Sequence, residues 1–264
     1  MFSESMRIGI WKFTLLCLVI CLYMGCSYKD EPTPEFISQV KTYDTPAGTI
    51  WVLNDKPSLG QVVLFHGLTV DHNQYFHGQQ ARAVTKLWTE GYQIIFIDLP
   101  NTTVPFPYVK LKETLNETYL ENWNDRIAHL LSYLDEKFGI PAKRTVGGIS
   151  WGGLHSLMTA AAFAEFMNYF ALIPVTDVKF LSGFNEIQVD SFSPYFRIED
   201  LVPKHGFIAW AGRDSAVDPK ASGDFVLKLV LAGADLTPQY HGTIGHEISE
   251  EMINQLCRWL DTIR

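Results

Sequence analysis

The chain has 264 residues, of which 47% are hydrophobic and 13% aromatic, so it is long enough to bury a full core as one domain. Its formal net charge of −8 and the absence of a basic cluster argue against a nucleic acid as partner. The sequence has no internal repeat and no low-complexity tract.

The N-terminal stretch has the composition of a targeting segment. Arg7 and Lys12 precede an apolar run over residues 13–25, which is shorter than the roughly 20 residues that a transmembrane helix needs. A positive flank followed by a short apolar core is typical of a secretory signal, which is not part of the fold. We therefore predict a signal segment over residues 1–25.

The apolar run stops at Gly25-Cys26, and this junction resembles a bacterial lipoprotein signal, in which a small residue precedes the lipidated cysteine. Tyr23 and Met24 depart from the usual pattern, and an uncleaved signal anchor or a simply secreted protein are the alternatives. The resemblance implies export and attachment to a bacterial cell-envelope membrane through a lipid on Cys26. Residues 26–45 are expected to form a polar tether and the start of the first strand. Cys257 is the one cysteine beyond this region, which excludes a disulfide within the folded domain.

Past the polar tether the chain alternates between strand-like and helix-like segments. The expected strands, with the first two as a pair around a turn, are 36–43, 49–54, 61–65, 92–97, 144–149, 169–173, 206–211 and 236–240. The expected helices are 79–90, 113–138, 154–166, 219–232 and 247–263. Such alternation predicts an α/β protein with a mostly parallel eight-stranded sheet covered by helices on both faces, and a functional site at the carboxyl ends of the strands.

Ser150 is the centre of a Gly-x-Ser-x-Gly run between an expected strand and an expected helix. A serine at a very tight strand-to-helix turn has strained backbone angles and an exposed hydroxyl, and only glycine fits two residues before and after it. The flanking elements supply the context that this short pattern requires.

A serine hydroxyl becomes a useful nucleophile when a base accepts its proton and a third group orients that base. Asp214 follows one expected strand, and His246 lies between the last strand and the last helix. The chain order Ser150, Asp214, His246 is the order of one particular hydrolase fold.

These residues, together with His66-Gly67 after the third strand, resemble the landmarks of the α/β-hydrolase superfamily over roughly residues 46–264. The resemblance implies a three-layer α/β-hydrolase fold with Ser150 as nucleophile, His246 as general base and acid, and Asp214 as the group that orients the histidine. It also implies an oxyanion hole made of the backbone N–H groups of Leu68 and Trp151.

Other residues could compete for these roles. Asp177 follows the sixth strand, where some hydrolases of this fold place the acid, and His241 ends the last strand. Asp218 precedes Pro219 and is expected to cap a helix. We expect His66 to support its loop by hydrogen bonding and His155 to be packed in the core.

His72 and His77, with Asp71, invite comparison with a metal site. Their i, i+5 spacing does not bring both rings to one face of a helix, and no second ligand cluster follows, so we expect no metal. Neither a G-x-G-x-x-G nor a Walker pattern occurs, and no cofactor is expected.

The substrate is less well defined by the sequence, because fold does not fix it. About 30 residues separate the sixth and seventh strands, which predicts a small cap and an open site. Aromatic side chains there could line an acyl pocket or form a small core of their own: Trp151, Phe184, Phe192, Tyr195 and Phe196. The segment 169–177 resembles dienelactone-hydrolase-like and prolyl-oligopeptidase-like members. We expect a serine hydrolase that cleaves a small-molecule carboxylic ester with a short or modest acyl group, the alternatives being a prolyl-oligopeptidase-like peptidase and an idle surface-binding module.

Overall fold

One twisted eight-stranded sheet organises the domain in the computed structural model, which describes residues 34–56, 59–100, 115, 117–180 and 192–263. The strand order is β1-β2-β4-β3-β5-β6-β7-β8, and the strands from β4 to β8 run parallel to one another. The antiparallel pairs β1–β2 and β2–β4 close one edge. The strands are β1 Lys41–Thr45, β2 Gly48–Leu53, β3 Gln61–Phe65, β4 Gln93–Ile97, β5 Arg144–Ile149, β6 Asn168–Leu172, β7 His205–Ala211 and β8 Leu236–His241.

Burial along the strands follows their place in the sheet. All residues of β3, β4, β5 and β6 are buried, as expected for parallel strands that are covered on both faces. The outer strands β1 and β8 alternate between exposed and partly buried residues. The central strands therefore form the rigid base on which the loops at their carboxyl ends are placed.

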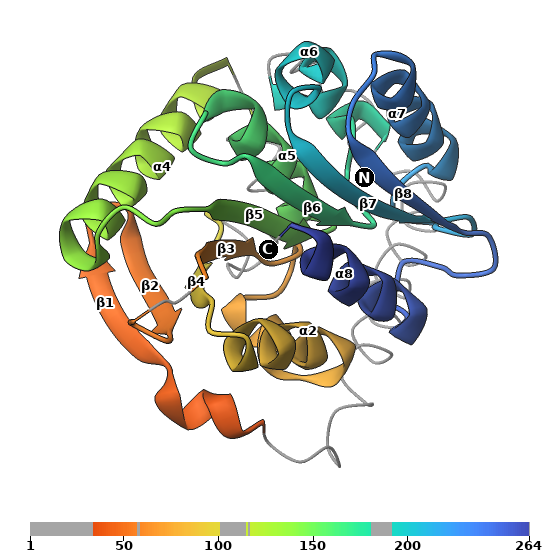
Figure 1. Cartoon of the computed structure of the whole chain (residues 1–264). Helices are drawn as coiled ribbons and strands as arrows, with labels where there is room; N and C mark the ends of the chain where they lie inside the picture. Colours follow the sequence, from red (N-terminus) through yellow and green to blue (C-terminus); the bar gives the residue numbers. More distant parts are fainter. Residues whose placement is uncertain (1–33, 57–58, 101–114, 116, 181–191, 264) are drawn as a thin grey trace, which may run out of the picture. The chain divides into compact units, whose positions relative to one another are not determined.

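Helices cover both faces of this sheet, which gives three layers (Figure 1). On one face α2 and α8 pack against each other and bury one apolar cluster. On the other face α4, α5 and α7 bury the second. The helices are α2 Gly78–Thr89, α4 Glu117–Phe138, α5 Trp151–Ala162, α6 Ile198–Leu201, α7 Pro219–Leu231 and α8 Glu250–Thr262, and the short 3-10 helices are η1 Glu35–Gln39, η2 His72–Phe76, η3 Val178–Phe180 and η5 Pro194–Phe196.

Local signals in the sequence account for several of these ends. The Asp218 side chain accepts a hydrogen bond from the Lys220 N–H at the start of α7, with Pro219 at the first helical position, and so acts as the expected N-cap. Ser249 caps α8 in the same way through Met252. The eight-stranded α/β arrangement predicted from the sequence is confirmed.

The start of the domain differs from the prediction. Where a strand was expected over residues 36–43, the chain first forms the 3-10 helix η1, and strand β1 begins only at Lys41. Phe36 is fully buried within η1, so its apolar character reflects packing against the α2–α8 face and not strand pairing. The segment Pro34–Arg264 forms one unit that includes β1, while the predicted signal segment, Cys26 and most of the tether lie outside the described residues.

The segment between β6 and β7, where a small cap is expected, is described only in part. Its described elements are η3, η5 and α6, and residues 181–191, which include Phe184, lie outside the described range. In the described part of the chain, no helix is both long enough and apolar enough to cross a lipid bilayer.

Candidate active site

Ser150 lies on the sharp turn between β5 and α5, with φ 54° and ψ −113°. Positive φ is unfavourable for a residue with a Cβ, so the surrounding structure must enforce this conformation. The Ser150 N–H donates to the Leu172 carbonyl at 2.9 Å, and the Ser150 carbonyl accepts from Leu154 N at 3.1 Å and Val175 N at 3.3 Å. These bonds hold the turn between β5, β6 and the first turn of α5.

The two glycines of the motif are required by close backbone contacts. A Cβ on Gly148 would overlap the Gly152 carbonyl oxygen, and a Cβ on Gly152 would overlap the carbonyl oxygens of Phe65 and His66. The first contact closes the turn upon itself, and the second brings the start of α5 against the end of β3. Only glycine permits both approaches, which gives the Gly-x-Ser-x-Gly spacing its physical reason.

Ser150, His246 and Asp214 form a continuous hydrogen-bonded chain. Ser150 Oγ lies 2.9 Å from His246 Nε2, and His246 Nδ1 lies 2.7 Å from Asp214 Oδ2. A carboxylate can only accept hydrogen bonds, so Nδ1 carries the proton and Nε2 is free to accept from the serine hydroxyl. The structure thus brings the three residues together in the arrangement that activates a serine nucleophile.

Asp214 is held by its own loop. Its side chain is buried, and Oδ1 accepts hydrogen bonds from the backbone N–H groups of Ala216 at 2.8 Å and Val217 at 2.9 Å. This leaves Oδ2 directed at His246. With both carboxylate oxygens engaged, Asp214 has a fixed orientation from which it can set the rotation of the imidazole ring.

The loops after β7 and β8 are joined by backbone hydrogen bonds. Gly212 N donates to His241 O at 2.8 Å, and Arg213 N donates to Ile244 O at 2.9 Å. These bonds fix the loop that carries Asp214 against the loop that carries His246. The distance between acid and base is therefore set by the backbone as well as by their side chains.

The rival acid and base are engaged elsewhere. Asp177 is buried and forms an ion pair with Lys179, with Oδ2 and Nζ 3.0 Å apart. His241 Nε2 lies 3.1 Å from the Gln255 side-chain oxygen of α8. Neither makes a hydrogen bond to Ser150 or His246 within the described residues.

The predicted oxyanion donors follow two neighbouring strands, β3 and β5. Phe65 of β3 pairs with Gly148 of β5, and Leu68 and Trp151 each lie three residues beyond this pair. Neither the Leu68 N–H nor the Trp151 N–H donates a hydrogen bond to another described residue. Both donors therefore remain available to an oxygen atom at the carboxyl ends of β3 and β5.

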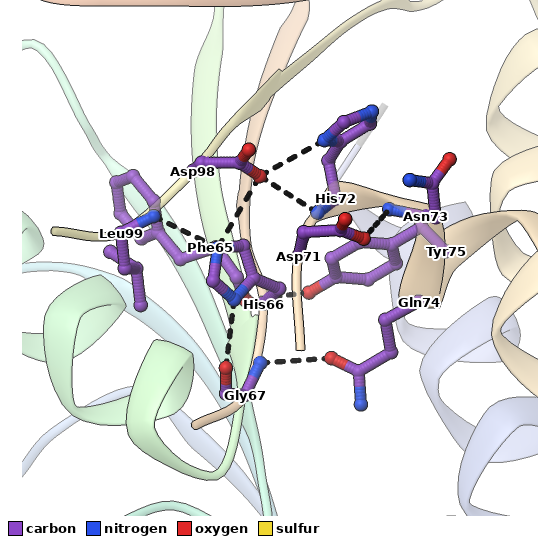
Figure 2. A network of polar contacts seen from close by, with 10 residues as sticks. All are labelled: Phe65, His66, Gly67, Asp71, His72, Asn73, Gln74, Tyr75, Asp98 and Leu99. Carbon is purple, nitrogen blue, oxygen red and sulfur yellow. Dashed lines mark hydrogen bonds and ion pairs between the residues drawn. The ribbon is translucent and has the colours of Figure 1, made fainter. Parts of the chain in front are cut away.

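His66 is buried directly before this loop and connects it to the loop after β4 (Figure 2). Its Nδ1 lies 2.7 Å from the Gly67 carbonyl oxygen, and its Nε2 accepts from the Leu99 N–H at 2.8 Å. Burial lowers the pKa of His66, which keeps the ring neutral with the proton on Nδ1. His66 supports the loop by hydrogen bonding, as expected from the sequence.

The residues considered for metal binding have other roles. Asp71 caps η2 through the Asn73 N–H, and His72 donates its backbone N–H to Asp98 Oδ1 at 2.8 Å while its Nδ1 lies 3.0 Å from the same oxygen. The His72 ring also stacks on Trp51, with centroids 3.5 Å apart. Across the described residues, no group of three or more histidine, cysteine, aspartate or glutamate side chains is arranged to hold a metal ion.

The Asp98 carboxylate, in the loop after β4, attracts His72 in the segment after β3. Burial raises its pKa, but the hydrogen bonds from His72 outweigh burial, so the pKa of Asp98 lies below its ordinary value. Asp98 Oδ1 also lies 3.4 Å from His66 Nε2. This contact could not be predicted from the sequence, because the partners come from different loops and follow no spacing rule.

His155 is fully buried one turn after Trp151 in α5. Its Nδ1 lies 2.9 Å from the Trp151 carbonyl oxygen, and its Nε2 lies 3.1 Å from the Tyr119 hydroxyl of α4. Burial lowers the pKa of His155 to about 3, so the ring is neutral at physiological pH. The packed position expected for this residue is confirmed.

The aromatic side chains expected near an acyl pocket divide into two groups. Trp151 and Phe192 are fully buried and contact His155 in the core, so these two form part of a packed cluster. Tyr195 carries the Lys228 ammonium 3.8 Å above its ring, and Phe196 is 51% exposed. Of these, Phe196 alone presents a large apolar surface to solvent.

Comparison with solved structures places this arrangement among known folds. The S-formylglutathione hydrolase FrmB from Staphylococcus aureus is 16% identical, with a TM-score of 0.60, and the match covers 84% of this chain and 94% of that one. The esterase Pf2001 from Pyrococcus furiosus is 14% identical, with a TM-score of 0.64 over 88% of this chain and 96% of that one. The fold is that of the α/β-hydrolases.

Larger proteins share the same domain. The acylaminoacyl peptidase from Pyrococcus horikoshii is 13% identical, with a TM-score of 0.67, and the match covers 89% of this chain but 42% of the peptidase. Comparison of the sequence with protein families and with curated proteins finds no match. At these identities the likeness concerns the fold, and the α/β-hydrolase fold carries both esterases and peptidases.

Proposed function

We propose that the chain is a serine hydrolase that cleaves a carboxylic ester with a short or modest acyl group through a covalent acyl-enzyme. The observation that carries the proposal is the chain of hydrogen bonds from Ser150 Oγ to His246 Nε2, at 2.9 Å, and from His246 Nδ1 to Asp214 Oδ2, at 2.7 Å. The fold supports it, since esterases such as Pf2001 have the same architecture.

In the proposed reaction, Ser150 Oγ attacks the ester carbonyl carbon while His246 Nε2 accepts the hydroxyl proton. The carbonyl oxygen becomes an oxyanion that the N–H groups of Leu68 and Trp151 stabilise. His246 then returns the proton to the leaving alcohol as the C–O bond breaks, which leaves an acyl group on Ser150. His246 then deprotonates a water molecule that attacks the acyl carbon, and it returns this proton to Ser150 Oγ as the bond between Oγ and the acyl carbon breaks, which releases the acid and restores the serine.

The ester preference is supported by the small size of the elements described between β6 and β7. The described part of the β6–β7 segment is short and its helices have three or four residues each, so a large lid is not built there from described elements. We expect a small ester to enter without the opening of a large lid there.

A peptidase of the prolyl-oligopeptidase-like kind is the second candidate. It is favoured by the similarity to the acylaminoacyl peptidase of Pyrococcus horikoshii, of which this chain covers 42%. An idle binding module is the third. It is disfavoured because a surface without catalytic turnover has no physical need for a strained serine, a bonded histidine and a buried carboxylate in one line.

Labelling with a fluorophosphonate probe tests the nucleophile. Wild-type protein should be labelled and Ser150→Ala should not. Unlabelled wild type, or equal labelling of the variant, would refute the assignment. Turnover of p-nitrophenyl esters against aminoacyl amides then separates esterase from peptidase, since faster amide cleavage would favour the second candidate.

For the location of the protein we propose a lipoprotein of a bacterial cell envelope, anchored through Cys26. The support is the short apolar run over residues 13–25 that ends at Gly25-Cys26 after a positive flank. Incorporation of a palmitate analogue into wild type, lost in Cys26→Ala, is the expected result. Equal labelling of the two would contradict the anchor.

A further inference from the structure

The Gln74 side chain makes one hydrogen bond to the loop that carries the proposed oxyanion donor Leu68. The Gly67 N–H donates to Gln74 Oε1 at 2.8 Å. Because a backbone N–H can only donate, the bonded atom of the carboxamide must be its oxygen, and the orientation of the amide is settled by its partner. Figure 2 shows the Gln74 oxygen facing Gly67 with its nitrogen turned away.

Two successive peptide units of this loop are thereby held by two different side chains. His66 binds the Gly67 carbonyl oxygen, which belongs to the same planar peptide unit as the Leu68 N–H. Gln74 binds the Gly67 N–H, which belongs to the unit before it. Between the two units lies only the α-carbon of Gly67, and glycine has the greatest backbone freedom of any residue. Together the two bonds restrain the Gly67 backbone on both sides of its α-carbon.

Gln74 is itself placed by a short helix that is tied to the end of β3. Asp71 caps η2 through the Asn73 N–H at 2.9 Å, and Gln74 N donates to Asp71 O at 3.1 Å. The next residue, Tyr75, is buried and donates its hydroxyl to the Phe65 carbonyl at 2.8 Å. The carboxamide is therefore presented to Gly67 from a supported position.

Gly67 also lies close to the residue that precedes Ser150. A Cβ on Gly67 would lie 3.6 Å from Gln74 Oε1 and 3.7 Å from the Ile149 carbonyl oxygen. The backbone of Gly67 thus has both the Gln74 carboxamide and the end of β5 as near neighbours. The bond between Gln74 and Gly67 is not explained by a need to stabilise η2, since that helix already has its cap and the Tyr75 hydrogen bond.

We propose that Gln74 is a positioning residue that aims the Leu68 N–H at the oxyanion, an inference that rests on the proposed function. Its effect falls on the transition state, because the negative charge on the carbonyl oxygen develops only there. Loss of the bond should therefore lower kcat while leaving KM nearly unchanged.

The test compares Gln74→Met with Gln79→Met in the full chain. Methionine keeps the length of the side chain but has no strong acceptor for the Gly67 N–H. Gln79→Met makes the same change in α2, where the Gln79 side chain accepts a hydrogen bond from Arg82 at 3.0 Å. With a p-nitrophenyl ester, Gln74→Met should lower kcat about tenfold, a fraction of the loss of a whole oxyanion donor, with KM within about twofold. Gln79→Met should retain kcat within about twofold.

A second measurement separates positioning from a structural role. A trifluoromethyl ketone, which forms a tetrahedral adduct with a serine nucleophile, should bind Gln74→Met about tenfold more weakly, whereas the carboxylic acid product should bind both variants alike. Equal kcat in the two variants, or equal losses for ketone and product, would overturn the proposal for Gln74. Failure of the wild type to react with a fluorophosphonate would instead overturn the proposed function, so the two failures are distinguishable.

Discussion

Two loops meet at the proposed site, and they are held in place by different forces. The turn around Ser150 is fixed by steric contacts, because Gly148 and Gly152 bring backbone atoms so close that no side chain fits. The loop from His66 to Gln74 is fixed by polar side chains, since His66 and Gln74 bind the two backbone groups of Gly67. In the proposed function, one loop presents the nucleophile and the other presents a hydrogen-bond donor.

The difference matches the accuracy that each role demands. The Ser150 turn stores strain at φ 54°, and close packing tolerates little motion, which suits an atom that must be aligned for attack. A backbone N–H acts through electrostatics, which weaken gradually with angle and distance. Side-chain hydrogen bonds are sufficient to aim it. Substitutions in the two loops should therefore differ in kind, the first abolishing function and the second reducing it by degrees.

The largest effect is expected where the serine loses its base. His246→Ala should lower turnover of an ester on the order of 10⁵-fold, nearly as much as Ser150→Ala, because the members of a triad act as a unit. The control is His241→Ala, whose ring contacts Gln255 of α8 and makes no contact with Ser150 among the described residues. Steady-state kinetics decide the matter: retained activity in His246→Ala together with its loss in His241→Ala would reverse the assignment of the base.

The steric side of the comparison is tested by Gly152→Ala. The added Cβ would overlap the Phe65 and His66 carbonyl oxygens, and the backbone cannot yield without moving α5 away from β3. We expect a loss of about 3 kcal/mol in the free energy of unfolding, together with loss of activity.

A second helical glycine provides the matched control for Gly152→Ala. A Cβ on Gly223 in α7 would lie 3.7 Å from Trp210 Nε1, which is ordinary contact. Gly223→Ala should therefore stabilise the protein by up to about 1 kcal/mol, since alanine is the better helix former. Urea unfolding measures both variants, and equal stability of the two would show that the approach of α5 to β3 is looser than described.

The turn around Ser150 could be predicted from the sequence because its conformation depends on residue types at fixed spacing. Glycine is needed two residues before and after Ser150 because the backbone contacts there leave no room for a side chain. The apolar runs of β3, β5 and β6 predicted these strands because every residue in them is buried. Asp214 and His246 were found because strand ends at one edge of a parallel sheet bring separate loops together.

The hydrogen bond that Gln74 makes in the loop from His66 to Gln74 could not be predicted in the same way. A carboxamide can bind any backbone N–H that it reaches, so nothing at Gln74 marks Gly67 as its partner. The start of α5 at Trp151, before two glycines that disfavour a helix, also escaped prediction, because the helix begins where the sheet edge and the Ser150 turn place it. Phe36 likewise has an apolar character that serves a 3-10 helix as well as a strand.

The support that polar side chains give to the loop from His66 to Gln74 is tested by His66→Phe, which keeps an aromatic ring but removes both hydrogen bonds of His66. Without them the Gly67–Leu68 peptide unit loses its direct support, and we expect kcat to fall about 100-fold with a small change in KM. Asp98→Asn is the control, because it alters the 3.4 Å contact with His66 Nε2 while leaving the bond to Gly67 in place. A smaller fall in His66→Phe than in Asp98→Asn would contradict the role given to the Gly67 carbonyl.

The smallest effect concerns the support beneath the turn around Ser150, where His155 binds the Trp151 carbonyl oxygen, and this effect depends on pH. Burial lowers the pKa of His155 from 6.5 to about 3, so between these values the unfolded chain binds a proton that the folded chain does not. Stability is therefore complete above about pH 6.5 and falls as the pH decreases toward 3, with a slope of at most about 1.4 kcal/mol per pH unit from this residue. His155→Phe should be less stable at pH 7, since it loses the bonds to Trp151 and Tyr119, but its stability should fall less steeply in acid. Urea unfolding at a series of pH values between 4 and 7 measures the two slopes, and parallel curves would show that His155 already binds a proton in the folded protein.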